Sequence, residues 1–291
     1  CASGLLPHYL EVGELSATAP DAKTFAPYVE LKIPPICDIL TALLLSFMVG
    51  VGSIFTNSTA LKRVFDEFGN IVKLTIEKAV IPFLPFYIFT MMCEMSASGK
   101  LSVVMGSGVK IIATGVALSI CYLILQYLIA GAVARKNPFK CLWNIMPAYF
   151  TGFSLCSSSA VIPVTLACAM KNGTCKDIAD FVIPLCSTVH MCGSTIKLTV
   201  TSVAVAYMCG IEITPAMFVN FALIQAVAAV AAPGLMGGVL MASIGLLESV
   251  LGFTPDQCAL MMTIYLALDG YGPACNVSGD AAIALVIDKI F

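Results

Sequence analysis

The stretch SLCSSSAVIPVT, Ser154 to Thr165, places a run of hydroxyl side chains and a proline inside an otherwise apolar segment. A second apolar segment is interrupted in the same way by AAPGLMGG, Ala231 to Gly238. Broken backbone is tolerated at membrane depth only where it lines a cavity or is buried in protein. Paired interruptions therefore point to the binding site of a transporter. We predict two re-entrant helical hairpins, at about 149–170 and about 221–247.

Close helix packing is the simpler explanation for a lone serine or glycine in a membrane segment. A serine triplet, a proline and a matching break later in the chain favour a binding site instead. The hydroxyls have no His–Asp partner at usable spacing, so we do not expect an activated nucleophile or an enzyme.

Composition places the chain in a membrane. Of its 291 residues 59% are hydrophobic and only 11% are charged, with a mean hydropathy of +0.96. That charge is too little to cover the surface of a soluble domain. The apolar runs are continuous and reach the length of about 20 residues that crosses a bilayer, which favours helices over barrel strands. We predict an all-α, multi-pass protein of the cell membrane, and the net charge of −2 argues against nucleic acid as a partner.

Three apolar spans are expected before the first hairpin, at about 36–55, 79–96 and 109–133, with an amphipathic helix at 61–78. Lysine and arginine gather in the loops that follow the first and third spans. Because basic loops stay in the cytoplasm, residues 1–35 are expected to form an extracellular loop.

The last apolar segment, YLALDGYGPACNVSGDAAIALVIDKI (Tyr265 to Ile290), contains carboxylates. On a helix, Asp269, Pro273, Asn276 and Asp280 fall on one stripe. Carboxylates at membrane depth are expensive and usually face a bundle interior or a water-filled path. Their oxygens suit a hard cation such as Na⁺ or the ammonium group of a substrate. A polar clamp between helices is the structural alternative.

The segment FVIPLCSTVHMCGSTIKLTV, Phe181 to Val200, is also interrupted, at Thr188, His190, Met191, Gly193 and Ser194. Lys197 lies in the apolar part beyond this break. A lysine in such a place must extend to the membrane surface, pair with an acid or lose its proton.

The runs CSSSAVIPVT, STVHMCGST and ACNVSGDA, in this order and spacing, resemble the dicarboxylate/amino acid:cation symporter family. The resemblance covers the chain from Ile36 and implies eight membrane helices, two re-entrant hairpins, a homotrimer and an elevator movement. The first three helices of the family would be missing, so the chain looks like a C-terminal part. It would comprise scaffold-type fourth and fifth helices at 36–98 and a transport domain at 99–291, with the seventh helix at 181–207 and the eighth at 257–291.

The resemblance also implies roles for individual residues. The tips of the two hairpins would hold the substrate's carboxylate, Asp269 its amino group, and the last helix the rest of it. The substrate residues so implied are Ser157, Ser158, Ser159, Ala231, Pro233, Gly234, Asp269, Gly272, Pro273 and Asn276. The residues implied at sodium sites are Thr188, His190, Met191, Asn276 and Asp280.

Departures from the family pattern shape the expected function. Gly272 stands where the family places an arginine for acidic side chains, so we expect a small neutral amino acid such as serine, threonine or alanine, moved with Na⁺. Cys192 replaces an aspartate of a second sodium site. Lys197 would then act as a fixed charge in place of one cation, and His190 makes H⁺ a second candidate ion.

Other functions remain open at this point. An acidic amino acid or dicarboxylate symporter would need Lys197 as the partner of the second carboxylate. A substrate-gated anion channel or a non-transporting sensor on the same scaffold is an alternative of a different class.

Overall fold

The computed structural model describes residues 39–56, 59–75, 101–232, 237–267 and 269–291, with isolated residues between 78 and 97. Every regular element in these ranges is a helix, as the sequence predicts. The chain divides into two compact units, and most of the helices belong to the one that contains residues 103–291.

The other unit, residues 19–102, contributes α3 (Ile39–Thr56) and α4 (Thr59–Thr75). Helix α4 confirms the amphipathic helix expected at 61–78. Its exposed face bears the ion pair of Arg63 and Glu67, whose nitrogen and oxygen are 3.0 Å apart one turn from each other. The predicted loop at 1–35 and most of the span expected at 79–96 lie outside the described residues.

Helix α6 (Leu101–Ala134) is one long helix that includes the third predicted span at about 109–133. Its polar Ser119 and Tyr127 are buried, whereas Leu125 and Ile129 are about half exposed. An apolar surface around a more polar interior is what a helix facing lipid requires. By length and composition, the helical stretches 108–134 and 176–208 of the described chain are able to cross a membrane.

The first predicted hairpin consists of α8 (Met146–Leu155), the short 3-10 helix η3 (Ser159–Val161) and α9 (Ile162–Lys171), preceded by α7 (Pro138–Asn144). Helix α8 ends because Cys156 turns left-handed, with a φ of 51°. Each of the two main helices has 10 residues and is about 15 Å long, half of what the bilayer core needs.

The next segments are broken too. Helices α10 (Lys176–Val189) and α11 (Cys192–Met208) meet at His190 and Met191, where the sequence predicts an interruption. Helices α12 (Pro215–Ala231) and α13 (Gly238–Leu251) correspond to the second predicted hairpin.

The final segment differs from expectation. One helix is predicted at 257–291, but the structure has α14 (Pro255–Ala267) and α15 (Tyr271–Ile290), with Asp269 in the turn between them. The turn packs tightly, because a Cβ on Gly270 would lie 2.7 Å from the carbonyl oxygen of Phe153. Asp269 therefore precedes the helix that carries Asn276 and Asp280, and its carboxylate is free to face other elements.

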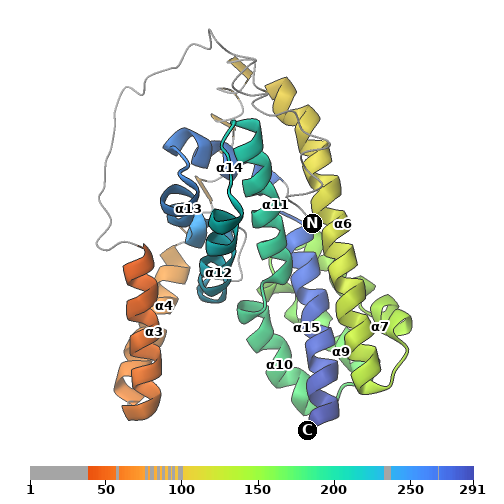
Figure 1. The fold of residues 1–291 in the computed structure, drawn as a ribbon. Helices are drawn as coiled ribbons and strands as arrows, with labels where there is room; N and C mark the ends of the chain where they lie inside the picture. Colours follow the sequence, from red (N-terminus) through yellow and green to blue (C-terminus); the bar gives the residue numbers. More distant parts are fainter. Residues whose placement is uncertain are drawn as a thin grey trace. The chain divides into compact units, whose positions relative to one another are not determined.

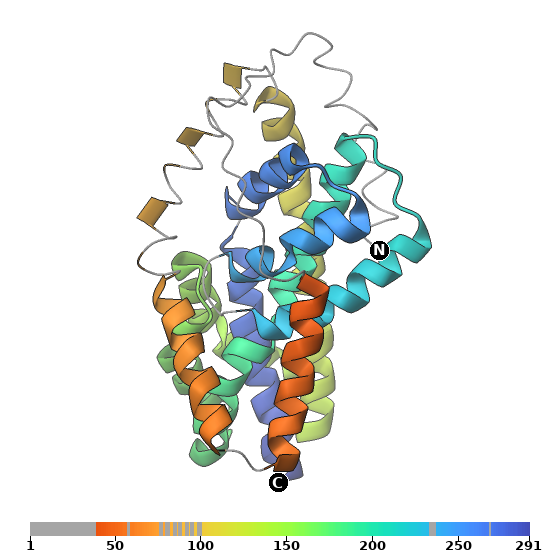
Figure 2. The same cartoon turned by 90° about the vertical axis from the view of Figure 1, so that its left-hand side faces the viewer.

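Helix α15 forms the centre of this unit. It contacts α8, α9, α10 and α11. Figures 1 and 2 show it in blue, running to the C-terminus. Its residues from Tyr271 to Ala282 are all buried, including Asn276 and Asp280. Close approach depends on Gly193 in α11, since a Cβ there would overlap Cys275 and the carbonyl of Gly272. The most polar residues of the last helix thus face the breaks in its neighbours.

Candidate functional site

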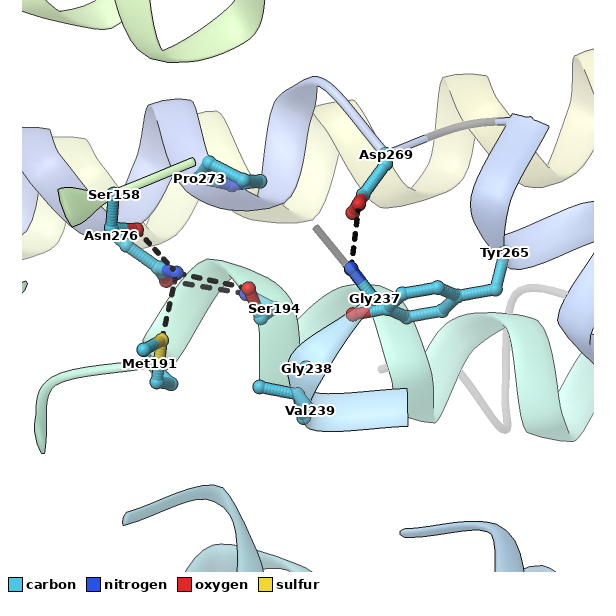
Figure 3. A pocket seen from close by; sticks show the side chains of 10 residues that line it. All are labelled: Ser158, Met191, Ser194, Gly237, Gly238, Val239, Tyr265, Asp269, Pro273 and Asn276. Atoms are coloured by element: carbon cyan, nitrogen blue, oxygen red, sulfur yellow. Dashed lines mark hydrogen bonds between the residues drawn. The ribbon is translucent and has the colours of Figure 1, made fainter. Parts of the chain in front are cut away.

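Asn276 joins two of the helix breaks. Its Oδ1 accepts the backbone N–H groups of Gly193 (2.7 Å) and Ser194 (3.2 Å) in the first turn of α11. Its Nδ2 donates to the Ser194 hydroxyl at 2.9 Å, the Ser158 hydroxyl at 3.4 Å and the Met191 sulfur at 3.3 Å. Figure 3 shows the contacts of Ser158, Met191 and Ser194 converging on the amide. Asn276 therefore satisfies the otherwise open helix start of α11 and connects it to the serine-rich break.

A pocket lies beside this amide. It is lined by residues of both broken segments, the start of α13 and the turn before α15: Ser158, Met191, Ser194, Gly237, Gly238, Val239, Tyr265, Asp269, Pro273 and Asn276. Its free space is on the order of one water molecule. These elements must separate before an organic substrate fits between them.

Lys197 and Asp269 form a buried ion pair at the edge of the pocket. The lysine side chain is fully buried and its Nζ donates to Asp269 Oδ1. The same ammonium faces the backbone carbonyl of Tyr265 at 3.3 Å and lies 3.4 Å from the centroid of its ring. Asp269 Oδ2 accepts the backbone N–H of Gly237 at 3.0 Å, a contact drawn in Figure 3. Both oxygens of this carboxylate are thus engaged.

Asp280 pairs with the residue at the break between α10 and α11. His190 Nδ1 is 2.9 Å from Asp280 Oδ1. The second oxygen, Oδ2, is buried and has no hydrogen-bond partner among the described residues, and neither has Oε1 of nearby Gln126. A Cβ on Gly279 would overlap both the imidazole and the Gln126 amide, so these groups crowd one point of α15. An unpartnered carboxylate oxygen in the interior is the kind of atom that a hard cation seeks.

The structure brings together only part of the predicted site. Ser158, Met191, Asp269, Pro273 and Asn276 line one pocket. Ser157 and Ser159 flank Ser158 in the same break, and Gly272 packs against Ser194, where a Cβ would lie 3.2 Å from the hydroxyl. His190 and Asp280 form their own pair.

Two predicted residues point elsewhere. Thr188 is exposed and its hydroxyl donates to the Leu185 carbonyl of its own helix, as threonines in helices often do. Ala231 is exposed at the end of α12. Pro233 and Gly234 lie outside the described residues.

Sequence reasoning missed half of the pocket. Ser194 follows the break and bonds to Asn276 through both its N–H and its hydroxyl; a second hydroxyl beside a break was the available signal. Tyr265 contacts Lys197 through its ring and its backbone carbonyl. A tyrosine within an apolar run gives no sign of such a contact in the sequence. Gly237, Gly238 and Val239 also line the pocket at the start of α13. The two glycines end the interruption AAPGLMGG, so the sequence indicated this break but not which of its residues reach the pocket.

The fold and the site together define a class: an all-helical, strongly apolar protein with a polar pocket built at the breaks of its helices. The family model described as the sodium:dicarboxylate symporter family matches residues 10–290. The chain belongs to this family.

Individual relatives are 28% to 33% identical to this chain over the matched residues. Excitatory amino acid transporter 3 of Mus musculus is 30% identical over 174 residues, 60% of this chain and 33% of the relative. Neutral amino acid transporter B(0) of Mus musculus is 33% identical over 149 residues, 50% of this chain and 27% of the relative. Serine/threonine transporter SstT of Acinetobacter baylyi is 28% identical over 255 residues, 84% and 63% of the two chains. The matches thus span about a third of the mammalian relatives and less than two thirds of the bacterial one.

Proposed function

We propose that this chain carries the binding site of a secondary active symporter, which moves a small solute with one carboxylate across the membrane together with Na⁺. The observation that carries the proposal is the pocket at Asn276, where two helix breaks and the start of α13 converge on one buried amide. Membership of a symporter family supports the reaction class.

The substrate's carboxylate is assigned to the donor side of the pocket. Ser158 and Ser194 offer hydroxyls, which Asn276 holds in place through its amide, and the start of α13 offers backbone N–H groups that have no partner inside the helix. The only carboxylate in this lining, Asp269, already has its cation. A second carboxylate on the substrate would have to be buried without a counter-charge, since Gly272 supplies none. An acidic amino acid is therefore disfavoured, and a monocarboxylate of the size of serine, threonine or alanine is favoured.

The co-transported cation is assigned to Asp280. Its buried Oδ2 has no hydrogen-bond partner in the ranges that the structure describes, and its other oxygen contacts His190 at the break between α10 and α11. Asn276 would act indirectly, because its Oδ1 is occupied by two backbone N–H groups. Na⁺ is the cation we propose, with H⁺ as the competing candidate.

The wider mechanism is also a proposal. Residues 99–291 would form the transport domain, with re-entrant hairpins at α8–α9 and α12–α13, and residues 36–98 would belong to the scaffold of a homotrimer. An elevator movement would carry the pocket across the membrane. The helix breaks support this arrangement, because half-length helices fit segments that enter and leave on one side.

Uptake into proteoliposomes tests the proposal. The full-length protein is reconstituted, and labelled L-serine, L-alanine, L-lactate, glycerate and L-aspartate are offered with an inward Na⁺ gradient or with choline. We expect Na⁺-driven accumulation of at least one monocarboxylate and not of aspartate, with the Asn276→Ala variant inactive and the exposed-site control Asn220→Ala active. Substrate-gated current without accumulation would indicate a channel, and binding without flux a sensor; either outcome overturns symport.

A further inference from the structure

The buried pair of Lys197 and Asp269 limits which substrates the pocket accepts. The lysine ammonium is fully used: it donates to Asp269, faces the Tyr265 carbonyl at 3.3 Å and lies over the Tyr265 ring. Its side chain has no exposed surface, so it has no route to water in this conformation. The ammonium group is therefore a permanent part of the site and does not belong to the protein surface.

Asp269 is the carboxylate that a positively charged substrate group would need. Among the residues that line the pocket it alone bears a negative charge. One of its oxygens holds Lys197 and the other holds the N–H of Gly237. An incoming ammonium would thus have to displace a cation that is tethered to α11 and held by three groups.

The energetic consequence follows from burial. An ammonium group taken out of water without a carboxylate partner loses several kcal/mol of solvation, even after the surroundings relax. If the substrate displaced Lys197 instead, the lysine would be left unpaired in the same interior. In either case an α-amino group on the substrate costs binding free energy, whereas a hydroxyl or keto oxygen at the same carbon does not.

The opposite side of the pocket supports the same conclusion about the substrate. The hydroxyls of Ser158 and Ser194 and the first backbone N–H groups of α13 are donors, which suit an anion. With the pair of Lys197 and Asp269 neutral, one negative charge on the substrate is matched by donors and by the cation that travels with it.

We propose that Lys197 serves as a built-in substitute for the substrate's ammonium group, so that the site takes small monocarboxylates without an amino group, such as short hydroxy or keto acids. This inference rests on the proposed function and narrows its monocarboxylate to one without an α-amino group, which departs from the neutral amino acid expected from the sequence. The relatives named above as amino acid transporters would differ from this chain in that respect.

The test uses pairs of acids that differ only in the group at the α-carbon: L-lactate against L-alanine, and L-glycerate against L-serine. Binding is measured in detergent as the rise in melting temperature at saturating Na⁺, and uptake is measured in proteoliposomes. We expect the wild type to prefer each hydroxy acid by about tenfold or more, because the ammonium has no free partner.

The Lys197→Met variant frees Asp269, so it should reverse the preference toward alanine and serine. Lys171→Met, an exposed lysine on α9, is the matched control and should leave the preference unchanged. If the single variant does not fold, the double variant Lys197→Met with Asp269→Asn keeps the pocket neutral, and it should retain the preference for hydroxy acids.

A wild type that prefers the amino acids overturns the inference, and so does a Lys197→Met variant with the wild-type ratio. Hydroxy-acid binding without Na⁺-driven uptake would support this inference and contradict symport, which separates the two proposals. Failure of all four acids to bind would overturn both.

Discussion

Asp269 and Asp280 are both buried carboxylates in the last third of the chain, and each is paired with a cation-forming side chain from the broken segment α10–α11. Their environments differ. Both oxygens of Asp269 are occupied, one by Lys197 and one by the Gly237 N–H, whereas one buried oxygen of Asp280 has no partner within the described part of the chain. The hydrogen bonds of the Asp269 carboxylate are therefore satisfied by the described residues, and those of the Asp280 carboxylate are satisfied only in part. The difference separates a group that organises the pocket from a group that is available to a travelling cation.

The largest effect is expected from removing the charge of Asp269. Asp269→Asn leaves the Lys197 ammonium buried without a counter-ion and should lower the free energy of unfolding by about 3–5 kcal/mol. Denaturation in mixed detergent measures this loss. The double variant with Lys197→Met should recover most of it, because neither charge then remains. An Asp269→Asn variant as stable as the wild type would erase the contrast between the two carboxylates.

A smaller effect is expected where α11 meets α15. Gly193→Ala introduces a Cβ that overlaps Cys275 and the carbonyl of Gly272, so it should cost about 1–3 kcal/mol of stability and weaken substrate and Na⁺ binding together. Gly108→Ala in α6 is the matched control, because its Cβ would meet nothing within 4 Å. A change in only one of the two bindings would mean that the carboxylates are not held by this shared contact.

Asp280→Asn tests the incomplete carboxylate. The amide preserves size but removes the charge that we assign to the cation, so half-maximal uptake should require about tenfold more Na⁺ or more. The loss of stability should be smaller than for Asp269→Asn. Asp177→Asn, at an exposed acid of α10, provides the control. Unchanged Na⁺ dependence would show that the free oxygen of Asp280 does not serve the cation.

The smallest effect is expected at Thr188. Its hydroxyl bonds to the Leu185 carbonyl in its own helix and its side chain is exposed, so Thr188→Ala should change the stability by no more than about 0.5 kcal/mol. Titrating uptake against Na⁺ should give the wild-type curve. A strong shift would return Thr188 to the sodium site that the family resemblance implies.

The sequence predicted the positions of the helix breaks better than it predicted which side chains pair with one another. Ser158, His190 and Asn276 could be selected because polar groups and helix interruptions stand out in an apolar chain. Lys197 could be recognised as needing an acid, but Asp269 lies 72 residues away, and several helices separate the two. Pairings at such distances depend on how helices pack, which a periodic pattern does not encode.

The turn at Asp269 was missed for a related reason. A stripe of Asp269, Asn276 and Asp280 fits one continuous helix, and the stripe was given more weight than Gly270, Gly272 and Pro273, whose residue types favour an interruption. The structure explains the interruption further through Phe153, whose carbonyl lies against Gly270, and through the two groups that bind the Asp269 carboxylate. Local pattern identified the polar face, and tertiary contacts decided where its helix begins.

The closed pair of Lys197 and Asp269 has a consequence for the electrical work of transport. A lone carboxylate carried across the membrane would move one charge through the potential, which is about 2.3 kcal/mol for each 100 mV. In the proposed transport cycle the ion pair would move with no net charge and would add nothing to that work. With one anionic solute in the pocket and one Na⁺ at Asp280, the cargo would also be neutral. Membrane voltage would then have little effect on transport, and the concentration gradients of the solute and Na⁺ alone would set the direction of net transport.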